Sequence, residues 1–425
     1  MYISKITLIN VRCFSEETIE LSESHPSLLI AGNNATGKSS ILRSIAMGLC
    51  DEASAGGLLR ELPGDFIRTG EKDATIKIEF TEEEGAKWVI ETKLKTYENL
   101  NFERVEQDYF KNEELVDWQI FPWDELFIAG YGAGLRTDGT ADYDQYFSGD
   151  AVYTLFKYSQ TLQNPELAWR RLQSIDGIDK KVIDENISSI LGEVLGLDES
   201  SKVVLEPYGI FINKDGNNVE LGAVGDGYRA MTTLILDLLS WQFLMQNKDQ
   251  EKGSGWRPLS MDNIRGIVII DEIEKHLHPL LQRRIIKHLY NKFKKIQFII
   301  STHSPLCVSG VSDVIDGPWE IASSHVADGQ HKITEKPLPS GLRADQILVE
   351  YFDLKTTVSI EVEKTISDYQ DLFSKIDKSD DDKSKLKELQ EQLEKYNYNL
   401  AESVKDREIQ KQLLIMLKNE GINDD

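Results

Sequence analysis

The sequence predicts an α/β protein, a mixed sheet flanked by helices, and two observations lead to this fold class. Short apolar runs typical of buried strands occur at residues 27–31, 264–270 and 297–300. Segments with helical spacing follow the first two runs, at about 38–50 and 279–293. Strands that alternate with helices in this way are typical of a sheet covered on both faces.

The first half of the chain is predicted to hold further strands and then an inserted helical segment. Residues 1–12 alternate between apolar and polar side chains, which indicates a half-buried strand. Residues 73–97 alternate as well and predict a hairpin, and 126–129 form another short apolar run. From 150 to 202 the pattern becomes helical, and we interpret this part as an inserted helical subdomain.

The second half is predicted to contain a hairpin at 203–220, with Asp215-Gly216 as its turn, and a helix at 228–245. In residues 356–425 apolar side chains recur three or four positions apart, which predicts amphipathic helices. We therefore divide the chain into four parts. Residues 1–149 form the first lobe of an α/β head, 150–202 the inserted subdomain and 203–340 the second part of the head. Residues 341–425 form a helical C-terminal region for a partner or oligomer contact.

Composition excludes several classes of protein. Asp plus Glu number 72 against 48 Lys plus Arg, a net charge of −24, which disfavours general coating of nucleic acid. Three cysteines lie far apart in the sequence, which fits a reducing compartment and offers no zinc site. No run of 18 apolar residues occurs, so a cytoplasmic protein without a membrane span is expected.

A phosphate-binding motif follows the first apolar strand. Residues 32–39 read G-N-N-A-T-G-K-S and fit G-x-x-x-x-G-K-[ST] without a mismatch, between a strand and a helix. Backbone N–H groups of such a loop cradle phosphate oxygens at the start of the helix. Lys38 is expected to reach the β- and γ-phosphates of ATP, and Ser39 to bind Mg²⁺. The predicted nucleotide-binding residues are Gly32, Asn33, Asn34, Ala35, Thr36, Gly37, Lys38, Ser39 and Ser40.

Polar residues at the ends of two later strands complete the predicted catalytic set. Asp271 and Glu272 directly follow the apolar run at 264–270. Asp271 is expected to hold Mg²⁺, and Glu272 to orient or deprotonate an attacking water. His303 follows the next strand, where it is placed to contact the γ-phosphate. The expected catalytic residues are therefore Lys38, Glu272 and His303.

Three weaker patterns have competing interpretations. Val224-Gly225-Asp226-Gly227 opens a helix and leaves free amides that suit an anion, although alone this signal is weak. His276 and His278 have H-x-H spacing, but no cysteine or further histidine stands nearby to complete a metal site. The basic run at 283–295 is more typical of a solvated face, with a DNA-contacting patch as the alternative.

The order of these features resembles the ABC-type ATPase head of the RecF, SMC and OLD group. That order is the P-loop, a long insertion, the glycine-rich helix start, the strand ending in Asp-Glu and the strand-end histidine. The resemblance covers residues 1 to about 330. It implies that Arg12, in the run Ile9-Asn-Val-Arg-Cys-Phe14, lies near the nucleotide. It also implies a signature motif that caps the ATP of a second subunit in a head-to-tail dimer. The residues of that motif are Val224, Gly225, Asp226 and Gly227.

Two departures from the group's pattern bear on the activity. Gly225 replaces the usual serine of the signature and Asp226 replaces the next glycine, so a hydroxyl donor to the partner's γ-phosphate is lost. Slow hydrolysis is therefore expected. No glutamine stands where the group carries its Q-loop, and the corresponding strand end reads Gly130-Tyr-Gly-Ala-Gly134. Arg136 follows as a candidate for contact with phosphate or a partner, with a surface arginine in a loop as an equal alternative.

The resemblance is strongest to ATPase subunits of bacterial antiphage systems of the Septu type, with the PARIS type as a rival. It implies a homo-oligomer of head dimers that gates a separate HNH-type nuclease. A nuclease within this chain is not expected, because Asp142-Tyr-Asp144 and Asp380-Asp-Asp382 do not close apolar strands. The alternative is a RecF-like, ATP-dependent clamp on duplex DNA, which the −24 charge disfavours. The ATPase of a membrane transporter is the least favoured class.

Overall fold

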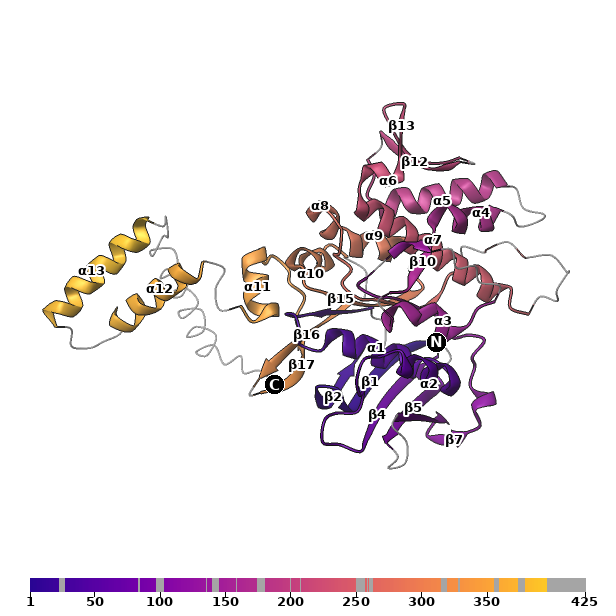
Figure 1. Ribbon diagram of the computed structural model, residues 1–425, viewed down its shortest axis with the longest axis horizontal. Helices are drawn as coiled ribbons and strands as arrows, with labels where there is room; N and C mark the ends of the chain where they lie inside the picture. Colours follow the sequence, from indigo (N-terminus) through magenta and orange to yellow (C-terminus); the bar gives the residue numbers. More distant parts are fainter. Residues whose placement is uncertain are drawn as a thin grey trace. The chain divides into compact units, whose positions relative to one another are not determined.

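The structure is a computed structural model, shown in Figure 1. It divides into two compact units, Met1–Asp353 and Leu354–Asp425, which are described separately. The residues described are 1–22, 27–82, 85–96, 103–134, 136–139, 145–157, 159–173, 180–198, 200–206, 208–249, 257, 259, 263–314, 319–327, 329–354, 359–373 and 379–395.

A six-stranded mixed sheet forms the centre of the first unit, as the sequence predicts. Its order is β17-β16-β3-β15-β14-β8, with β17 antiparallel to β16 and all other pairs parallel. The strands are β3 (Ser27–Ala31), β8 (Ile128–Tyr131), β14 (Gly266–Ile270), β15 (Ile296–Thr302), β16 (Trp319–Ala327) and β17 (Gln330–Lys336).

Helices cover both faces of this sheet, because its central strands are apolar on both sides. In β3, Leu28 packs into one hydrophobic cluster and Leu29 into the other, as the alternation of a strand requires. Helix α1 (Lys38–Gly48) belongs to the first cluster. Helices α7 (Asp226–Gln246), α9 (Ile285–Lys292) and α10 (Pro305–Val311) belong to the second.

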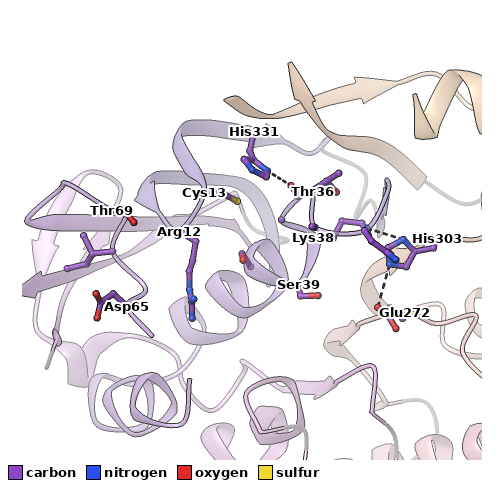
Figure 2. A pocket seen from close by; sticks show the side chains of 15 residues that line it. Arg12, Cys13, Thr36, Lys38, Ser39, Asp65, Thr69, Glu272, His303 and His331 are labelled. Carbon is purple, nitrogen blue, oxygen red and sulfur yellow. Dashed lines mark hydrogen bonds and ion pairs between the residues drawn. The ribbon is translucent and has the colours of Figure 1, made fainter. Parts of the chain in front are cut away.

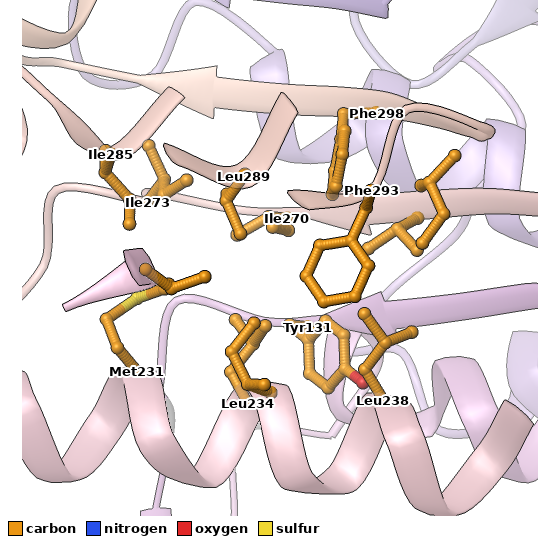
Figure 3. Packing of buried hydrophobic residues seen from close by; sticks show 14 of the residues in the cluster. Tyr131, Met231, Leu234, Leu238, Ile270, Ile273, Ile285, Leu289, Phe293 and Phe298 are labelled. Carbon is orange, nitrogen blue, oxygen red and sulfur yellow. The ribbon is translucent and has the colours of Figure 1, made fainter. Parts of the chain in front are cut away.

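Figure 3 shows part of that second cluster. Met231, Leu234 and Leu238 of α7 face Tyr131 at the end of β8 and Ile270 at the end of β14. This packing holds α7 against the carboxyl ends of β8 and β14, at the edge of the sheet where the predicted site lies.

A second six-stranded sheet, entirely antiparallel, has the order β2-β1-β4-β5-β6-β7. Side chains link the two sheets: Gln297 of β15 accepts a hydrogen bond from the Ile3 N–H (2.8 Å) and donates one to the Ile3 carbonyl (2.9 Å). In addition, Glu17 of β2 accepts the N–H of Ile333 in β17 (2.9 Å). The expected hairpin at 73–97 is part of this sheet. Its strands are β1 (Tyr2–Val11), β2 (Phe14–Glu20), β4 (Asp73–Thr81), β5 (Lys87–Thr96), β6 (Glu103–Lys111) and β7 (Glu114–Val116).

The segment between the two halves of the head contains helices together with short strands. The region of the expected hairpin at 203–220 belongs to a three-stranded sheet, because an additional strand, β11, pairs antiparallel with β12 up to the pair Glu206 and Gly209. Asp215 and Gly216, with φ of 51° and 84°, make the turn between β12 and β13. The elements are η1 (Trp118–Ile120), β9 (Arg136–Gly139), α3 (Ser148–Val152), η2 (Tyr153–Leu155), β10 (Thr161–Gln163), α4 (Pro165–Gln173), α5 (Lys180–Val194), β11 (Ser201–Glu206), β12 (Gly209–Lys214) and β13 (Asn217–Glu220).

Three shorter helices complete the head: α2 (Glu52–Arg60), α6 (Leu221–Val224) and α8 (Pro279–Gln282). The single helix expected at 279–293 is divided into α8 and α9, with Arg283 and Arg284 between them. Helix α11 (Ala344–Phe352) packs against α10 and β16, so the compact unit extends past the expected boundary at 340/341.

In the second unit, α12 (Ile360–Phe373) and α13 (Asp380–Lys395) contact each other. Tyr396 and Leu400 of the predicted apolar stripe lie outside the described residues. Within the part of the chain that the structure describes, no helix is both long and apolar enough to cross a membrane.

Candidate active site

The carboxyl ends of β3, β14 and β15 lie side by side, and the loops that follow them open onto one pocket of about 770 Å³ (Figure 2). Parallel strands place their carboxyl ends at one edge of the sheet, where ligands of such folds bind. Ten of the predicted site residues line this pocket: Arg12, Asn34, Ala35, Thr36, Gly37, Lys38, Ser39, Ser40, Glu272 and His303.

The two glycines of the P-loop are required by its backbone. Gly32 has φ 155°, and a Cβ there would lie 2.3 Å from the carbonyl oxygen of Ser324. Gly37 has φ 103°, and its Cβ would lie 2.6 Å from the ring of Phe14. Because neither position carries a side chain, the loop backbone can adopt this conformation and approach a ligand closely.

Lys38 is buried, with 4% of its surface exposed. Its ammonium donates hydrogen bonds to the carbonyls of Gly32 (2.8 Å) and Asn33 (2.6 Å). Burial lowers its pKa to about 8, although the negative charges of Asp271, Glu274 and Glu272 oppose this shift. Lys38 is therefore mostly protonated at neutral pH, as a phosphate-binding lysine must be.

His303 connects the P-loop to the acidic pair. Its Nδ1 lies 2.9 Å from the Gly32 carbonyl oxygen and 3.2 Å from Lys38 Nζ, and its Nε2 lies 3.5 Å from Glu272 Oε1. When Nδ1 accepts from the Lys38 ammonium, Nε2–H is the donor that faces Glu272. The ring is thus positioned between the phosphate-binding loop and the predicted base.

Asp271 and Glu272 differ in their surroundings in the way that their predicted roles require. Asp271 is 4% exposed, and its Oδ1 accepts a 2.5 Å hydrogen bond from Ser301 Oγ. The same Ser301 Oγ accepts the Glu272 N–H (2.9 Å), which holds Glu272 at a φ of 53°. The Glu272 side chain is 31% exposed and lines the pocket, where water can reach it.

The oxygen donors at this edge fit a magnesium ion. Mg²⁺ prefers oxygen ligands and is usually held by one or two protein groups together with substrate phosphates. The Ser39 hydroxyl and the buried Asp271 carboxylate are groups of this kind. Among the described residues no group of three His, Cys, Asp or Glu side chains is arranged to hold a metal ion by itself, and a site of this type does not need one.

Arg12 lies at the end of the pocket away from Glu272, as Figure 2 shows. Its φ is 50°, its N–H donates to the Phe66 carbonyl (2.8 Å), and its guanidinium lies 5.2 Å from the centre of the Phe66 ring. Burial, followed by repulsion from Arg43, lowers its pKa. Asp65 and Thr69 line the same end; sequence reasoning missed them because no motif marks this loop.

The signature residues lie elsewhere on the head. Gly225, with φ 152°, separates α6 from α7, and Val224 is 37% exposed. Gly227 is in close contact, since a Cβ there would lie 2.3 Å from the His276 carbonyl oxygen. None of residues 224–227 is among the described residues that line the P-loop pocket. In a single chain the structure does not bring the signature and the P-loop together.

The strand end where the group carries its Q-loop glutamine has little room for side chains. At the end of β8, a Cβ on Gly130 would lie 2.5 Å from Leu155 Cδ1, and one on Gly132 would lie 2.2 Å from the Thr154 carbonyl oxygen. The backbone of η2 thus occupies the space above this strand end. The side chain of Arg136 and the pair Asp142 and Asp144 lie outside the described residues.

In the other two weak patterns, His278 has a structural role and the basic run includes exposed residues. His278 is the N-cap of α8, where its Nδ1 accepts the Leu280 N–H (3.3 Å). In the basic run, Lys292 lies 3.4 Å from Glu193, whereas Arg283 and Lys287 are exposed.

A parallel sheet whose edge carries a P-loop, an Asp-Glu pair and a strand-end histidine defines a P-loop ATPase domain of the ABC type. Residues 28–309 match the family described as "AAA domain, putative AbiEii toxin, Type IV TA system", and the chain belongs to this family.

Two curated relatives and one solved structure are similar to the chain. The Septu protein PtuA of Bacillus mycoides (strain KBAB4) is 26% identical over 405 residues, which cover 93% of this chain and 51% of the relative. The Retron Vc95 probable ATPase of Vibrio cholerae serotype O1 biovar El Tor is 25% identical over 208 residues, or 41% of this chain and 38% of the relative. The SMC head domain from Thermotoga maritima has a TM-score of 0.45 at 16% identity, and the match covers 79% of this chain and 100% of that chain. The chain therefore spans about half of the Septu relative's length, and less of the retron relative's.

Proposed function

We propose that this protein binds ATP with Mg²⁺ and hydrolyses it, as the ATPase subunit of a bacterial antiphage defence complex. The observation that supports the ATPase chemistry is that Lys38, Ser39, Glu272 and His303 line one pocket although they come from three strand ends. The similarity to the Septu relative supports the place of this activity in defence.

Each residue has a role that follows from its position. The P-loop amides and Lys38 bind the phosphates, and Lys38 exchanges its carbonyl partners for phosphate oxygens. Glu272 orients and deprotonates the attacking water, and His303 contacts the γ-phosphate through Nε2. Ser39 and Asp271 would hold Mg²⁺, which neutralises charge that develops on the phosphates when it is bound. Arg12 would bind the end of the nucleotide remote from the γ-phosphate.

We propose further that the active form is a head-to-tail dimer within a homo-oligomer. The signature at Val224–Gly227, in which Val224 and Asp226 are exposed, would then cap the nucleotide in the P-loop pocket of a second copy. With Gly225 in place of serine, this cap contributes backbone amides and no hydroxyl, so turnover is expected to be slow. Nucleotide-dependent dimerisation would in turn gate a separate HNH-type nuclease.

The test uses the full-length chain and two substitutions in the pocket. Lys38→Ala should abolish ATP binding measured by calorimetry, while Lys87→Ala, an exposed lysine on β5, should bind as the parent does. Glu272→Gln should retain ATP binding, lose hydrolysis and shift the protein to a larger mass with ATP in light scattering. Tight ATP binding by Lys38→Ala would contradict the site, and a mass independent of nucleotide would contradict the dimer model.

The partner requires a separate experiment. An HNH-containing protein encoded beside this chain should copurify with it, and ATP should change the nuclease activity of the complex. ATP-dependent, salt-sensitive binding of duplex DNA by the chain alone, with no effect on a nuclease, would instead support the RecF-like clamp.

A further inference from the structure

The loop after β14 carries a third carboxylate, Glu274, which does not line the described pocket. Its side chain reaches the end of the neighbouring strand β15. Oε1 accepts the backbone N–H of His303 (2.6 Å), and Oε2 accepts the hydroxyl of Thr302 (2.8 Å). Both oxygens of the carboxylate are thus bonded to the segment that carries the site's histidine.

These two bonds belong to a longer network. Thr302 Oγ1 also accepts the N–H of Ser304 (3.0 Å), and Ser304 Oγ donates to Gln282 Oε1 (2.7 Å). The Gln282 amide group donates back to the Leu277 carbonyl (2.9 Å). The loop that follows β14 and the turn that follows β15 are therefore tied together by side chains at both ends.

The network fixes the backbone next to the two groups that face each other in the pocket. The His303 N–H is held by Glu274, while its ring lies 2.9 Å from the Gly32 carbonyl and 3.5 Å from Glu272. Glu272 itself has a φ of 53°, a left-handed conformation that is uncommon in a residue other than glycine. Loss of the Glu274 bridge would allow both segments to relax away from this arrangement.

We propose that Glu274 is a positioning residue, which sets the distance between His303 and Glu272 by bonding the backbone of the histidine turn. This inference rests on the proposed ATPase function for its kinetic consequence. The feature that matters is the reach of the side chain, because an acceptor must span from one strand end to the next. Its negative charge is secondary, since the oxygen of a neutral amide of the same length can still accept the His303 N–H, while the amide NH2 can donate to Thr302 Oγ1.

Two conservative substitutions separate reach from charge. Glu274→Gln keeps the reach and one oxygen acceptor without the charge. Glu274→Asp keeps the charge but is one methylene too short for the bridge. If Glu274 positions His303, the Asp variant should lose more activity than the Gln variant. A group that acted through its charge, on the metal or on Lys38, would give the opposite order.

The kinetic test compares ATP turnover by the full-length parent, Glu274→Gln, Glu274→Asp and Glu274→Ala. We expect Glu274→Ala and Glu274→Asp to lower kcat by roughly ten- to a hundredfold, with KM for ATP changed less than about threefold. Glu274→Gln should stay within about fivefold of the parent. Glu114→Ala, which removes an exposed carboxylate on β7, serves as the control. A parallel loss of kcat and ATP affinity in every variant, or an Asp variant more active than the Gln variant, would overturn the proposal.

A second readout does not depend on turnover. Hydrogen–deuterium exchange of the nucleotide-free chain should become faster in the peptide that contains His303 and Ser304 when Glu274 is replaced by alanine. Peptides from β1 should be unchanged. Parental exchange rates at 303–304 in Glu274→Ala would overturn the proposal even if activity fell. If the parent itself fails to hydrolyse ATP, the proposed function is wrong, and exchange alone decides whether Glu274 holds the histidine turn.

Discussion

Asp237 provides a prediction whose size can be calculated. It lies in the middle of α7, is 3% exposed, and its Oδ2 has no hydrogen-bond partner among the described residues. Burial raises the pKa of its carboxyl group from 3.8 to about 7, although Tyr131 and Trp241 partly oppose the shift. The folded state therefore keeps a proton that the unfolded state releases.

The sign of the effect follows from this difference. Well below the unfolded-state pKa of 3.8 both states are protonated, and Asp237 makes no contribution to the pH dependence. Between the two pKa values the unfolded state gains stability from ionisation, so the free energy of unfolding falls by about 1.4 kcal/mol per pH unit. Above pH 7 the loss levels off. Between pH 5.5 and 8.5 the total is about 2 kcal/mol.

Asp237→Asn should remove this loss. Urea denaturation measures the free energy of unfolding of the parent and the variant at pH 5.5 and at pH 8.5. The change between the two pH values is then compared between the proteins, so that any pH-independent effect of the amide on stability cancels. We expect the variant to gain about 2 kcal/mol relative to the parent on going to the higher pH. The exposed Asp73→Asn should show no such gain. Equal pH responses of parent and Asp237→Asn would refute the reasoning.

Three further substitutions have defined outcomes. Gly32→Ala should lower the free energy of unfolding by at least about 2 kcal/mol, because the new Cβ meets the Ser324 carbonyl at a positive φ; a parental thermal midpoint would contradict this. Gln297→Ala should lower the free energy of unfolding by about 2–4 kcal/mol, because the buried N–H and carbonyl of Ile3 lose their partner. In urea denaturation, a decrease below about 1 kcal/mol would show that water replaces the amide. Gly225→Ser should raise ATP turnover by restoring a hydroxyl, with a lower thermal midpoint because φ is 152° there; an unchanged or lower rate would mean that another step limits hydrolysis.

The parts of the site that sequence could predict are those encoded by consecutive residues. The P-loop is one run from Gly32 to Ser39, and its strand and helix are adjacent in sequence, so a local pattern was sufficient. Asp271 and His303 were predicted because each follows an apolar strand. Glu272 and His303 meet at the P-loop pocket because β3, β15 and β14 are neighbouring parallel strands.

The features that sequence missed depend on contacts between distant segments. The bridge from Glu274 to His303 exists only because β14 and β15 are neighbours, and an extra acid in an acidic loop does not reveal it. Asp65 enters the pocket through the pairing of residues 66–68 with the turn at Arg12, which no spacing rule predicts. The third strand, β11, is not predicted because the chain between β11 and β12 contains no Asp-Gly dipeptide like the one at Asp215-Gly216.

The two faces of the central sheet have a consequence for how mutations combine. Leu28 and Leu29 are adjacent in the chain, yet their side chains belong to different hydrophobic clusters. Leu29 shares its cluster with Ile300 and Ile270, which are far away in sequence. Truncations of Leu28 and Leu29 should therefore add nearly independently, whereas Leu29 and Ile300 should couple through a shared cavity. In this head, distance along the chain is a poor guide to epistasis, and the face of the sheet is the better one.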